Sequence, residues 1–158
     1  MIKLDGGLST ALENNGNKLT TSLWTGELIR TNPAQITKAH LDFINAGAQI
    51  IITSSYQLSY IGCGARGWSE DETNQALIAS TLLAKNAVSE SGKSVKVAAS
   101  VGPYGASLAD GSEYKGNYGV SKQVLKDFHA KRLEILISTS PDYLALETMP
   151  DTFRLRCY

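Results

Sequence analysis

Polar and glycine-rich segments follow each predicted strand, where their side chains could bind a small ligand. The segments are residues 5–7 (Asp-Gly-Gly), 53–57 (Thr-Ser-Ser-Tyr-Gln), 100–105 (Ser-Val-Gly-Pro-Tyr-Gly) and 147–148 (Glu-Thr). In parallel α/β folds, the carboxyl ends of the strands carry the ligand-binding residues. Two of the segments begin with a carboxylate, which accepts strong, charge-assisted hydrogen bonds. The segments therefore predict a polar pocket where the strand ends converge.

The elements that would position this pocket alternate between strand and helix. Short apolar stretches predict strands at residues 1–4, 48–53, 96–101 and 143–146, the second of them continuous enough to be buried on both faces. With helices between them, the order β-α-β-α-β-α-β predicts parallel strands with right-handed crossovers.

The helices have recognisable starts. One begins at Asn32-Pro33, a cap residue followed by proline at the first helical position, and closes at Gly47. A second begins at the capping box of Ser69 and Glu72 and extends to about residue 90. A third is indicated by apolar residues at positions 124, 125, 128, 135 and 136.

Periodicity alone leaves two architectures open, a doubly wound sheet and a (β/α)8 barrel. The polar segments follow every strand, which favours a barrel with its pocket at one rim. A complete barrel takes about 250 residues, so four strands in a chain of 158 residues make half of one. We therefore predict an α/β fold that is the N-terminal half of a barrel.

The composition excludes several classes of function. Fifteen basic and fifteen acidic side chains cancel, so no net field would draw the chain to nucleic acid or to an anionic membrane. No apolar run approaches the length of a membrane span, and residues 1–5 lack the pattern of a signal peptide. We expect a cytosolic protein in which both cysteines, Cys63 and Cys157, are reduced.

Five segments, in order, resemble the homocysteine S-methyltransferase family. They are the Leu-Asp-Gly-Gly opening at 4–13, Leu-Trp-Thr at 23–25, residues 46–57, the stretch 100–114 with its Gly-Pro-Tyr-Gly-Ala and Ala-Asp-Gly-Ser-Glu-Tyr segments, and Leu-Glu-Thr-Met-Pro at 146–150. The resemblance identifies residues 1–150 as a partial homocysteine-binding barrel domain. It leaves residues 151–158 as a divergent C-terminal tail, for which we consider a truncated or frame-shifted reading frame.

The resemblance implies a chemistry. Members of the family move a methyl group from a sulfonium donor, S-methylmethionine or S-adenosylmethionine, to homocysteine and form methionine. Zinc holds the homocysteine thiol as a thiolate, and the family takes its zinc ligands from cysteines in the second half of the barrel. We therefore predict no metal ligand and no catalytic residue in this chain, and no activity from it alone.

The resemblance also implies site residues. Asp5 and Glu147 should bind the amino group of homocysteine, and Tyr56 and Gln57 should line the pocket. Alternatively, Asp5 is a turn residue, Glu147 a helix-starting acid, and the other two ordinary loop residues. The residues expected to shape the rim of the pocket are Gly6, Gly7, Gly102, Pro103 and Tyr104.

Other chemically capable residues are given structural roles. We expect His40 to be a hydrogen-bonded core histidine, Cys63 a small loop residue, and Arg132 a side chain that extends towards solvent or pairs with a carboxylate. His129 receives no catalytic role.

Two other functions stay open. One is a non-catalytic half-barrel that binds an amino acid or self-associates through its open edges. The other is a doubly wound domain for a phosphate ligand, which ranks last because the glycines form neither G-x-G-x-x-G nor a P-loop.

Overall fold

The computed structural model describes residues 1–150, which form a parallel sheet with helices against one face. The strands β1 (Ile50–Ile52), β2 (Lys96–Val101) and β3 (Tyr143–Leu146) lie in the order β1-β2-β3. Ile51 pairs with Val97, and Ala99 pairs with Leu144. The parallel α/β architecture predicted from the sequence is therefore confirmed.

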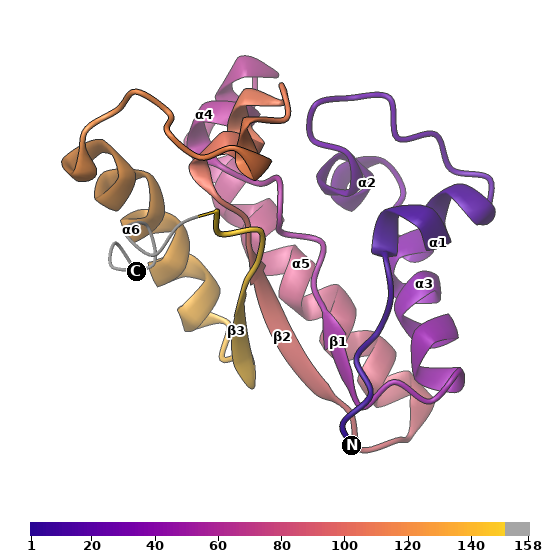
Figure 1. Ribbon diagram of the computed structural model, residues 1–158. Helices are drawn as coiled ribbons and strands as arrows, with labels where there is room; N and C mark the ends of the chain where they lie inside the picture. Colours follow the sequence, from indigo (N-terminus) through magenta and orange to yellow (C-terminus); the bar gives the residue numbers. More distant parts are fainter. Residues whose placement is uncertain (151–158) are drawn as a thin grey trace.

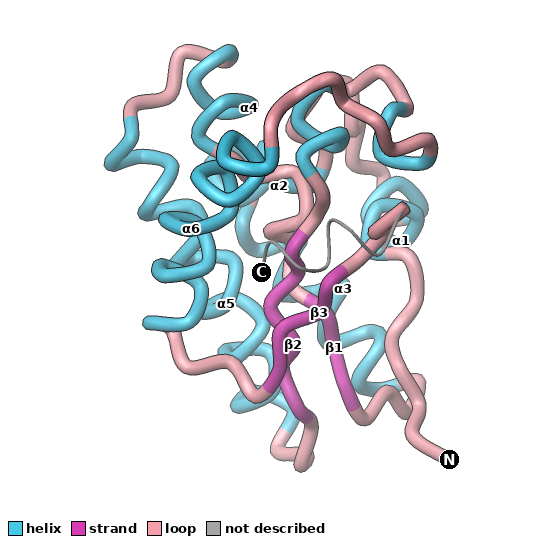
Figure 2. Tube along the Cα trace, turned by 60° about the vertical axis from the view of Figure 1, so that its left-hand side comes forward, coloured by secondary structure: helices cyan, strands magenta, loops and turns pink. Residues whose placement is uncertain are grey.

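Helices cover one face of the sheet and one end of its strands. In Figure 1, α5 (Glu70–Ser91) passes behind the strands, α6 (Lys122–Ser138) lies to their left and α3 (Pro33–Asn45) lies to their right. The remaining helices gather around the carboxyl ends of the strands, as Figures 1 and 2 show. They are α1 (Leu8–Asn14), α2 (Thr25–Thr31), α4 (Tyr60–Ala65), η1 (Tyr104–Leu108) and η2 (Ser112–Tyr114).

Helix α5 begins and ends as its sequence predicts. The Ser69 hydroxyl accepts a hydrogen bond from the Glu72 backbone N–H, and the Glu72 carboxylate accepts one from the Ser69 N–H. Gly92 follows the helix at φ +65°, the left-handed conformation that glycine adopts without strain. The capping box thus fixes the start of the longest helix.

The hydrophobic core lies between the sheet and its helices. Near the amino ends of the strands, Ile44 of α3 packs with Ile51, Val97 and two alanines of α5. Towards the carboxyl ends, a second group joins α1, α2, α3, α5 and α6 to β2. Its fully buried members include Leu12, Ile36, Leu77, Ala99, Val101 and Leu136. The half-barrel therefore has its own core on the helical side.

Two strand predictions were too long. At the N-terminus only Leu4 bridges Ile50, in parallel, so residues 1–4 do not form a full strand. The predicted strand 48–53 shortens to β1, in which Ile51 is fully buried while Ile50 and Ile52 are half-buried. Among the described residues, the helices cover one face of the sheet and leave the other open (Figure 1).

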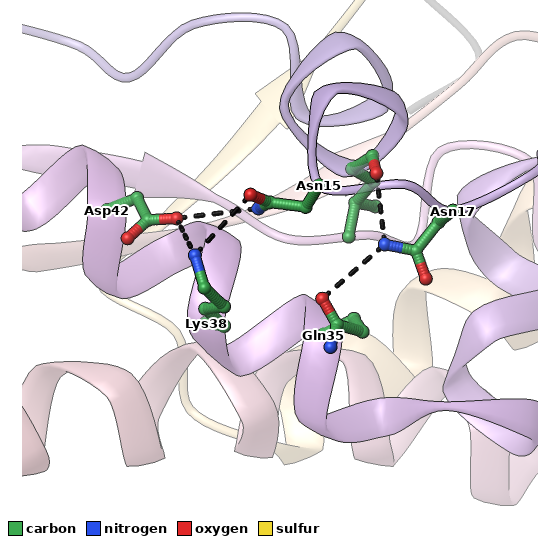
Figure 3. A network of polar contacts seen from close by, with 6 residues as sticks. Asn15, Asn17, Gln35, Lys38 and Asp42 are labelled. Atoms are coloured by element: carbon green, nitrogen blue, oxygen red, sulfur yellow. Dashed lines mark hydrogen bonds and ion pairs between the residues drawn. The ribbon is translucent and has the colours of Figure 1, made fainter.

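A polar network fastens α1 to α3 (Figure 3). Lys38 forms an ion pair with Asp42 at 2.6 Å, and Asn15 hydrogen-bonds to both side chains. Asn17 donates to the Leu12 carbonyl oxygen at 3.0 Å and to the Gln35 side chain. Exposed ion pairs contribute little individually, but this network holds the helix that follows the first predicted site segment. Within residues 1–150, no helix is long and apolar enough to cross a membrane.

Candidate functional site

A cavity of about 250 Å³ opens at the carboxyl ends of the strands. Its lining comes from the N-terminal segment, the strands β1 and β2, and the loops after β1 and β3. The starts of α1 and α2 and the short helix η2 complete it. These residues are Asp5, Gly6, Gly7, Leu8, Ser9, Trp24, Thr25, Ile52, Thr53, Tyr56, Gln57, Ser100, Glu113, Tyr114, Glu147 and Thr148. The charged members of this lining are all acidic.

Asp5 is held at the end of the N-terminal segment by the neighbouring strand. Its backbone N–H donates to the Ile50 carbonyl oxygen at 3.0 Å, and its carboxylate accepts the Ile52 N–H at 2.7 Å. Burial raises the pKa of Asp5 to about 6, with a further contribution from the negative charge of Glu147 and an opposing one from the Ile52 hydrogen bond. A cation placed beside Asp5 would stabilise its ionised form.

A closed ring of hydrogen bonds joins the ends of β1 and β2. The Ser55 hydroxyl donates to the Ser100 carbonyl oxygen at 2.7 Å, and the Ser100 N–H donates to the Thr53 hydroxyl at 3.0 Å. Since the Ser55 hydrogen is already used, Thr53 is the donor in the 2.8 Å hydrogen bond between the two hydroxyls. All three residues are buried, so the ring fixes this side of the cavity.

Glu147 follows β3 and is anchored to β2 twice. Its backbone N–H donates to the Val101 carbonyl oxygen at 3.2 Å, and its carboxylate accepts a hydrogen bond from the Ser100 hydroxyl. Burial raises the pKa of Glu147, against the effect of the Ser100 hydrogen bond. Asp5 and Glu147 therefore present two partly desolvated carboxylates to one cavity.

Tyr56 packs against the backbone at the end of β2. A Cβ atom at Gly102 would lie 2.4 Å from the Tyr56 carbonyl oxygen and 3.0 Å from the nearest carbon of the Tyr56 ring. Burial is the main cause that raises the pKa of Tyr56 to about 12; the charges of Glu113 and Glu147 act in the same direction, and a hydrogen bond with Thr148 acts against them. Its hydroxyl is therefore a neutral donor and acceptor at physiological pH.

The structure separates the predicted rim residues into two groups. Gly6 and Gly7 line the cavity, whereas Gly102, Pro103 and Tyr104 do not. Gly102 lies behind Tyr56, and the Tyr104 ring packs on Tyr118 and Phe128, at 5.4 and 5.1 Å between centroids. The loop after β2 thus supports the cavity from behind, because its aromatic residue joins the packing of α6.

Several lining residues were not among the predicted site residues, notably Trp24, Glu113 and Tyr114. They belong to segments that carried the family resemblance, which was the only signal that could have found them. Trp24 adopts φ +45°, an uncommon conformation for a non-glycine residue. That geometry places it at the start of α2, on the rim of the cavity.

Three structural roles differ from expectation. His40 is fully buried, but neither ring nitrogen has a hydrogen-bond partner among the described residues. Arg132 is 1% exposed and donates to the Gly102 carbonyl oxygen at 2.7 Å instead of extending to solvent, because α6 packs over the end of β2. Cys63 lies in α4, within the hydrophobic core.

Zinc, which the family resemblance implies, does not fit the described residues. Burial raises the pKa of the Cys63 thiol, which disfavours the thiolate that zinc requires. Within residues 1–150, no three His, Cys, Asp or Glu side chains are grouped so that they could hold an ion. Cys157 and the predicted tail 151–158 lie outside the described residues.

Fold and site together define a parallel α/β domain with an acidic cavity at the carboxyl ends of its strands. The family model for homocysteine S-methyltransferase matches residues 2–158. This chain belongs to the homocysteine S-methyltransferase family.

Individual relatives agree with that assignment. The chain is 42% identical to homocysteine S-methyltransferase 2 of Zea mays, covering 99% of this chain and 50% of the relative. It is also 42% identical to the Escherichia coli homocysteine S-methyltransferase, covering 96% of this chain and 51% of that one. The chain thus spans about half the length of the curated relatives that it matches.

A solved structure gives the same picture. The metallated form of the homocysteine methyltransferase MmuM from Escherichia coli superposes with a TM-score of 0.91 at 41% identity, over 99% of this chain and 57% of that one. The predicted fold, the N-terminal half of a (β/α)8 barrel, is therefore confirmed.

Proposed function

We propose that the cavity binds homocysteine, in a protein that transfers a methyl group from a sulfonium donor to the homocysteine thiol and forms methionine. The observation that carries this proposal is the pair of partly buried carboxylates, Asp5 and Glu147, at one cavity. The ammonium group of an amino acid offers hydrogen-bond donors and a compensating positive charge to both. Gln57 and the neutral Tyr56 hydroxyl would contact the rest of the ligand.

The transfer itself exchanges one carbon–sulfur bond for another. The thiolate of homocysteine attacks the methyl carbon, and the electron pair of the breaking bond stays on the donor sulfur, which becomes a neutral thioether. Free thiols have a pKa near 8.5, so the thiolate must be stabilised. The residues of this chain bind and orient the amino acid. We propose that the zinc-binding cysteines lie in the other half of the family's barrel, so that this chain alone binds substrate without turnover.

Calorimetric titration of the 158-residue chain with homocysteine tests this function. We expect binding that weakens about tenfold or more in Asp5→Asn and in Glu147→Gln, since each removes one charge from the ammonium site. Glu90→Gln, at an exposed position near the end of α5, is the matched control. Equal binding by all four proteins would refute the site. Tight zinc binding, or zinc-dependent methylation of homocysteine by this chain, would refute the proposal that this chain binds substrate without turnover.

The exposed side of the sheet supports a second proposal, self-association. The edge strand β3 and the N-terminal segment leave apolar side chains exposed, including Leu4, Tyr143, Leu144 and Leu146. Parallel sheets are ordinarily covered on both faces, so we propose that two copies of this chain pair through this open sheet surface. Size-exclusion chromatography with light scattering would give a dimer mass, and Leu144→Lys would give a monomer. A monomeric wild-type chain at high concentration would contradict this proposal.

A further inference from the structure

We infer that Glu113 and Gln57 form a separate subsite that accepts the positive charge of a sulfonium group. The inference rests on the proposed function and deepens it, because it assigns the methyl donor to a part of the cavity other than the Asp5–Glu147 pair. Both residues line the cavity. Each carries a side-chain oxygen without a hydrogen-bond donor among the described residues, Oε2 of Glu113 and Oε1 of Gln57.

Unpaired acceptors of this kind are costly in a protein that binds nothing there. A buried polar group without a partner costs about 1–3 kcal/mol, and more when it is charged. Gln57 is only 7% exposed, so water cannot replace the missing donor easily. The Glu113 charge reaches the cavity, since it contributes to the raised pKa of Tyr56. A positively charged ligand is the chemistry that would offset both costs.

The local backbone holds Glu113 in this place. A Cβ atom at Gly105 would lie 2.5 Å from the Glu113 backbone nitrogen, so only glycine lets η1 approach η2 this closely. Gly111 begins η2 at φ +79°, and the Ser112 N–H donates to the Asp110 carboxylate at 2.9 Å. These contacts turn the chain twice within a few residues and direct position 113 towards the cavity.

A sulfonium group is a cation that a carboxylate and an amide oxygen can stabilise without directed hydrogen bonds. It carries a full positive charge without any N–H, so it is recognised by charge and by oxygen dipoles instead of by directed donors. Asp5 and Glu147 already receive donors from Ile52 and Ser100 and leave further lone pairs for an ammonium group. The two pairs therefore divide the cavity between an amino-acid head and a sulfonium.

A subsite for the sulfonium at Glu113 would affect donor binding and product release differently. Methyl transfer removes the positive charge from the donor sulfur, so the attraction of Glu113 acts on the substrate and ends when the thioether product forms. Glu113 would therefore determine donor affinity and product release and would not stabilise the transition state. It is a specificity-determining residue, distinct from a catalytic one.

Titration with matched ligand pairs tests the subsite. S-methylmethionine and methionine differ by one methyl group and its charge, and S-adenosylmethionine and S-adenosylhomocysteine form a second such pair. We expect the 158-residue chain to bind the sulfonium of at least one pair about tenfold more tightly than its thioether. The pair that shows the preference identifies the donor. Glu113→Gln should reduce the preference to about twofold or less, while Glu113→Asp should retain most of it.

The outcomes separate the two proposals. If homocysteine binding depends on Asp5 but sulfonium and thioether bind equally, the subsite is wrong and the proposed function survives. A sulfonium preference that persists in the Glu113→Gln variant also overturns the subsite, provided that the variant is folded. The thermal midpoint of the variant shows whether it is folded. If the chain binds neither homocysteine nor a sulfonium, both proposals fail.

Discussion

The backbone of Gly102 lies so close to Tyr56 that a Cβ atom at position 102 would be 2.4 Å from the Tyr56 carbonyl oxygen. Arg132 holds the Gly102 carbonyl oxygen from the opposite side through its 2.7 Å hydrogen bond. The loop after β1 is thus supported by the end of β2, which in turn is held by α6. Side chains that line the cavity therefore depend on contacts outside it.

We predict that Gly102→Ala displaces Tyr56 and destabilises the fold. The new methyl group would displace backbone atoms of Tyr56, which cannot move as easily as the end of a flexible side chain. Overpacking of this kind costs about 1–3 kcal/mol. Chemical denaturation would measure the loss. Gly64→Ala is the control, because Gly64 lies exposed in α4 with no atom near its added Cβ, and alanine there should be neutral or slightly stabilising. Equal effects of the two substitutions would contradict the prediction.

The Asp5 carboxyl group should make the ligand-free chain less stable as pH rises. Its pKa is about 6 in the folded chain and has an ordinary value of 3.8, so between these values the folded state holds more protons than the unfolded state. The Asp5 contribution to the free energy of unfolding therefore falls as pH increases from about 4 to about 6, whereas the His40 contribution rises over the same range. Solvent reaches part of the group, so we expect a change of only about 1 kcal/mol. Asp5→Asn should remove this contribution, which is measured as the difference between the variant and the wild type in pH-dependent denaturation. An unchanged pH dependence would contradict the prediction.

Binding of homocysteine should show the opposite pH dependence. Ionised Asp5 is the form that attracts an ammonium group, so affinity should increase as pH rises through about 6. Titrations at several pH values would reveal uptake or release of protons with binding. The increase centred near pH 6 should disappear in Asp5→Asn. It should remain in Glu147→Gln, because burial and not the Glu147 charge is the main cause of the raised Asp5 pKa.

His40 should destabilise the chain in acid. Burial lowers its pKa to about 4 from an ordinary value of 6.5, so the unfolded state binds more protons in this range and stability falls as pH decreases. His40→Leu should remove this loss. It should also raise stability near neutral pH by about 1 kcal/mol, because neither ring nitrogen has a described partner. A destabilised His40→Leu variant would indicate a partner beyond the described residues.

Ser55→Ala should break the buried ring at the ends of β1 and β2. It leaves the Ser100 carbonyl oxygen without the Ser55 donor and the Thr53 hydroxyl without its acceptor, at a cost of about 1–3 kcal/mol. Ser89→Ala, at an exposed position of α5, is the control and should change stability little. Similar stability of the two variants would show that the ring contributes little.

The sequence predicted the elements whose signals are local. The capping box of Ser69 and Glu72, the strand at 96–101 and the strand at 143–146 all appear as expected, since each depends on neighbouring residues. The lengths of the first two strands are set by backbone pairing with distant residues, which no local pattern states. Within residues 1–150, helices cover one face of the sheet and Ile50 and Ile52 are only half-buried, so the predicted two-sided burial of residues 48–53 was wrong there.

The candidate site also combines residues that the sequence could indicate with residues that only long-range packing places. The family resemblance proposed Asp5, Tyr56, Gln57 and Glu147, which follow predicted strands, and the structure brings all four to one cavity. Glu113 was not among the predicted site residues, because it reaches the cavity through two consecutive short 3-10 helices whose direction depends on Gly105 and Gly111. Long-range packing likewise buries Arg132 and His40, although their sequence neighbours permit an exposed or hydrogen-bonded side chain.

The strand order of the sheet has a consequence for synthesis on the ribosome. Because β1, β2 and β3 lie side by side in the order in which they are translated, each new strand and helix can dock on the free edge left by the previous unit. No strand has to insert between two that have already paired. Growth of the nascent chain and growth of the sheet can therefore proceed in the same direction, and the acidic cavity is completed when Glu147 docks beside Ser100.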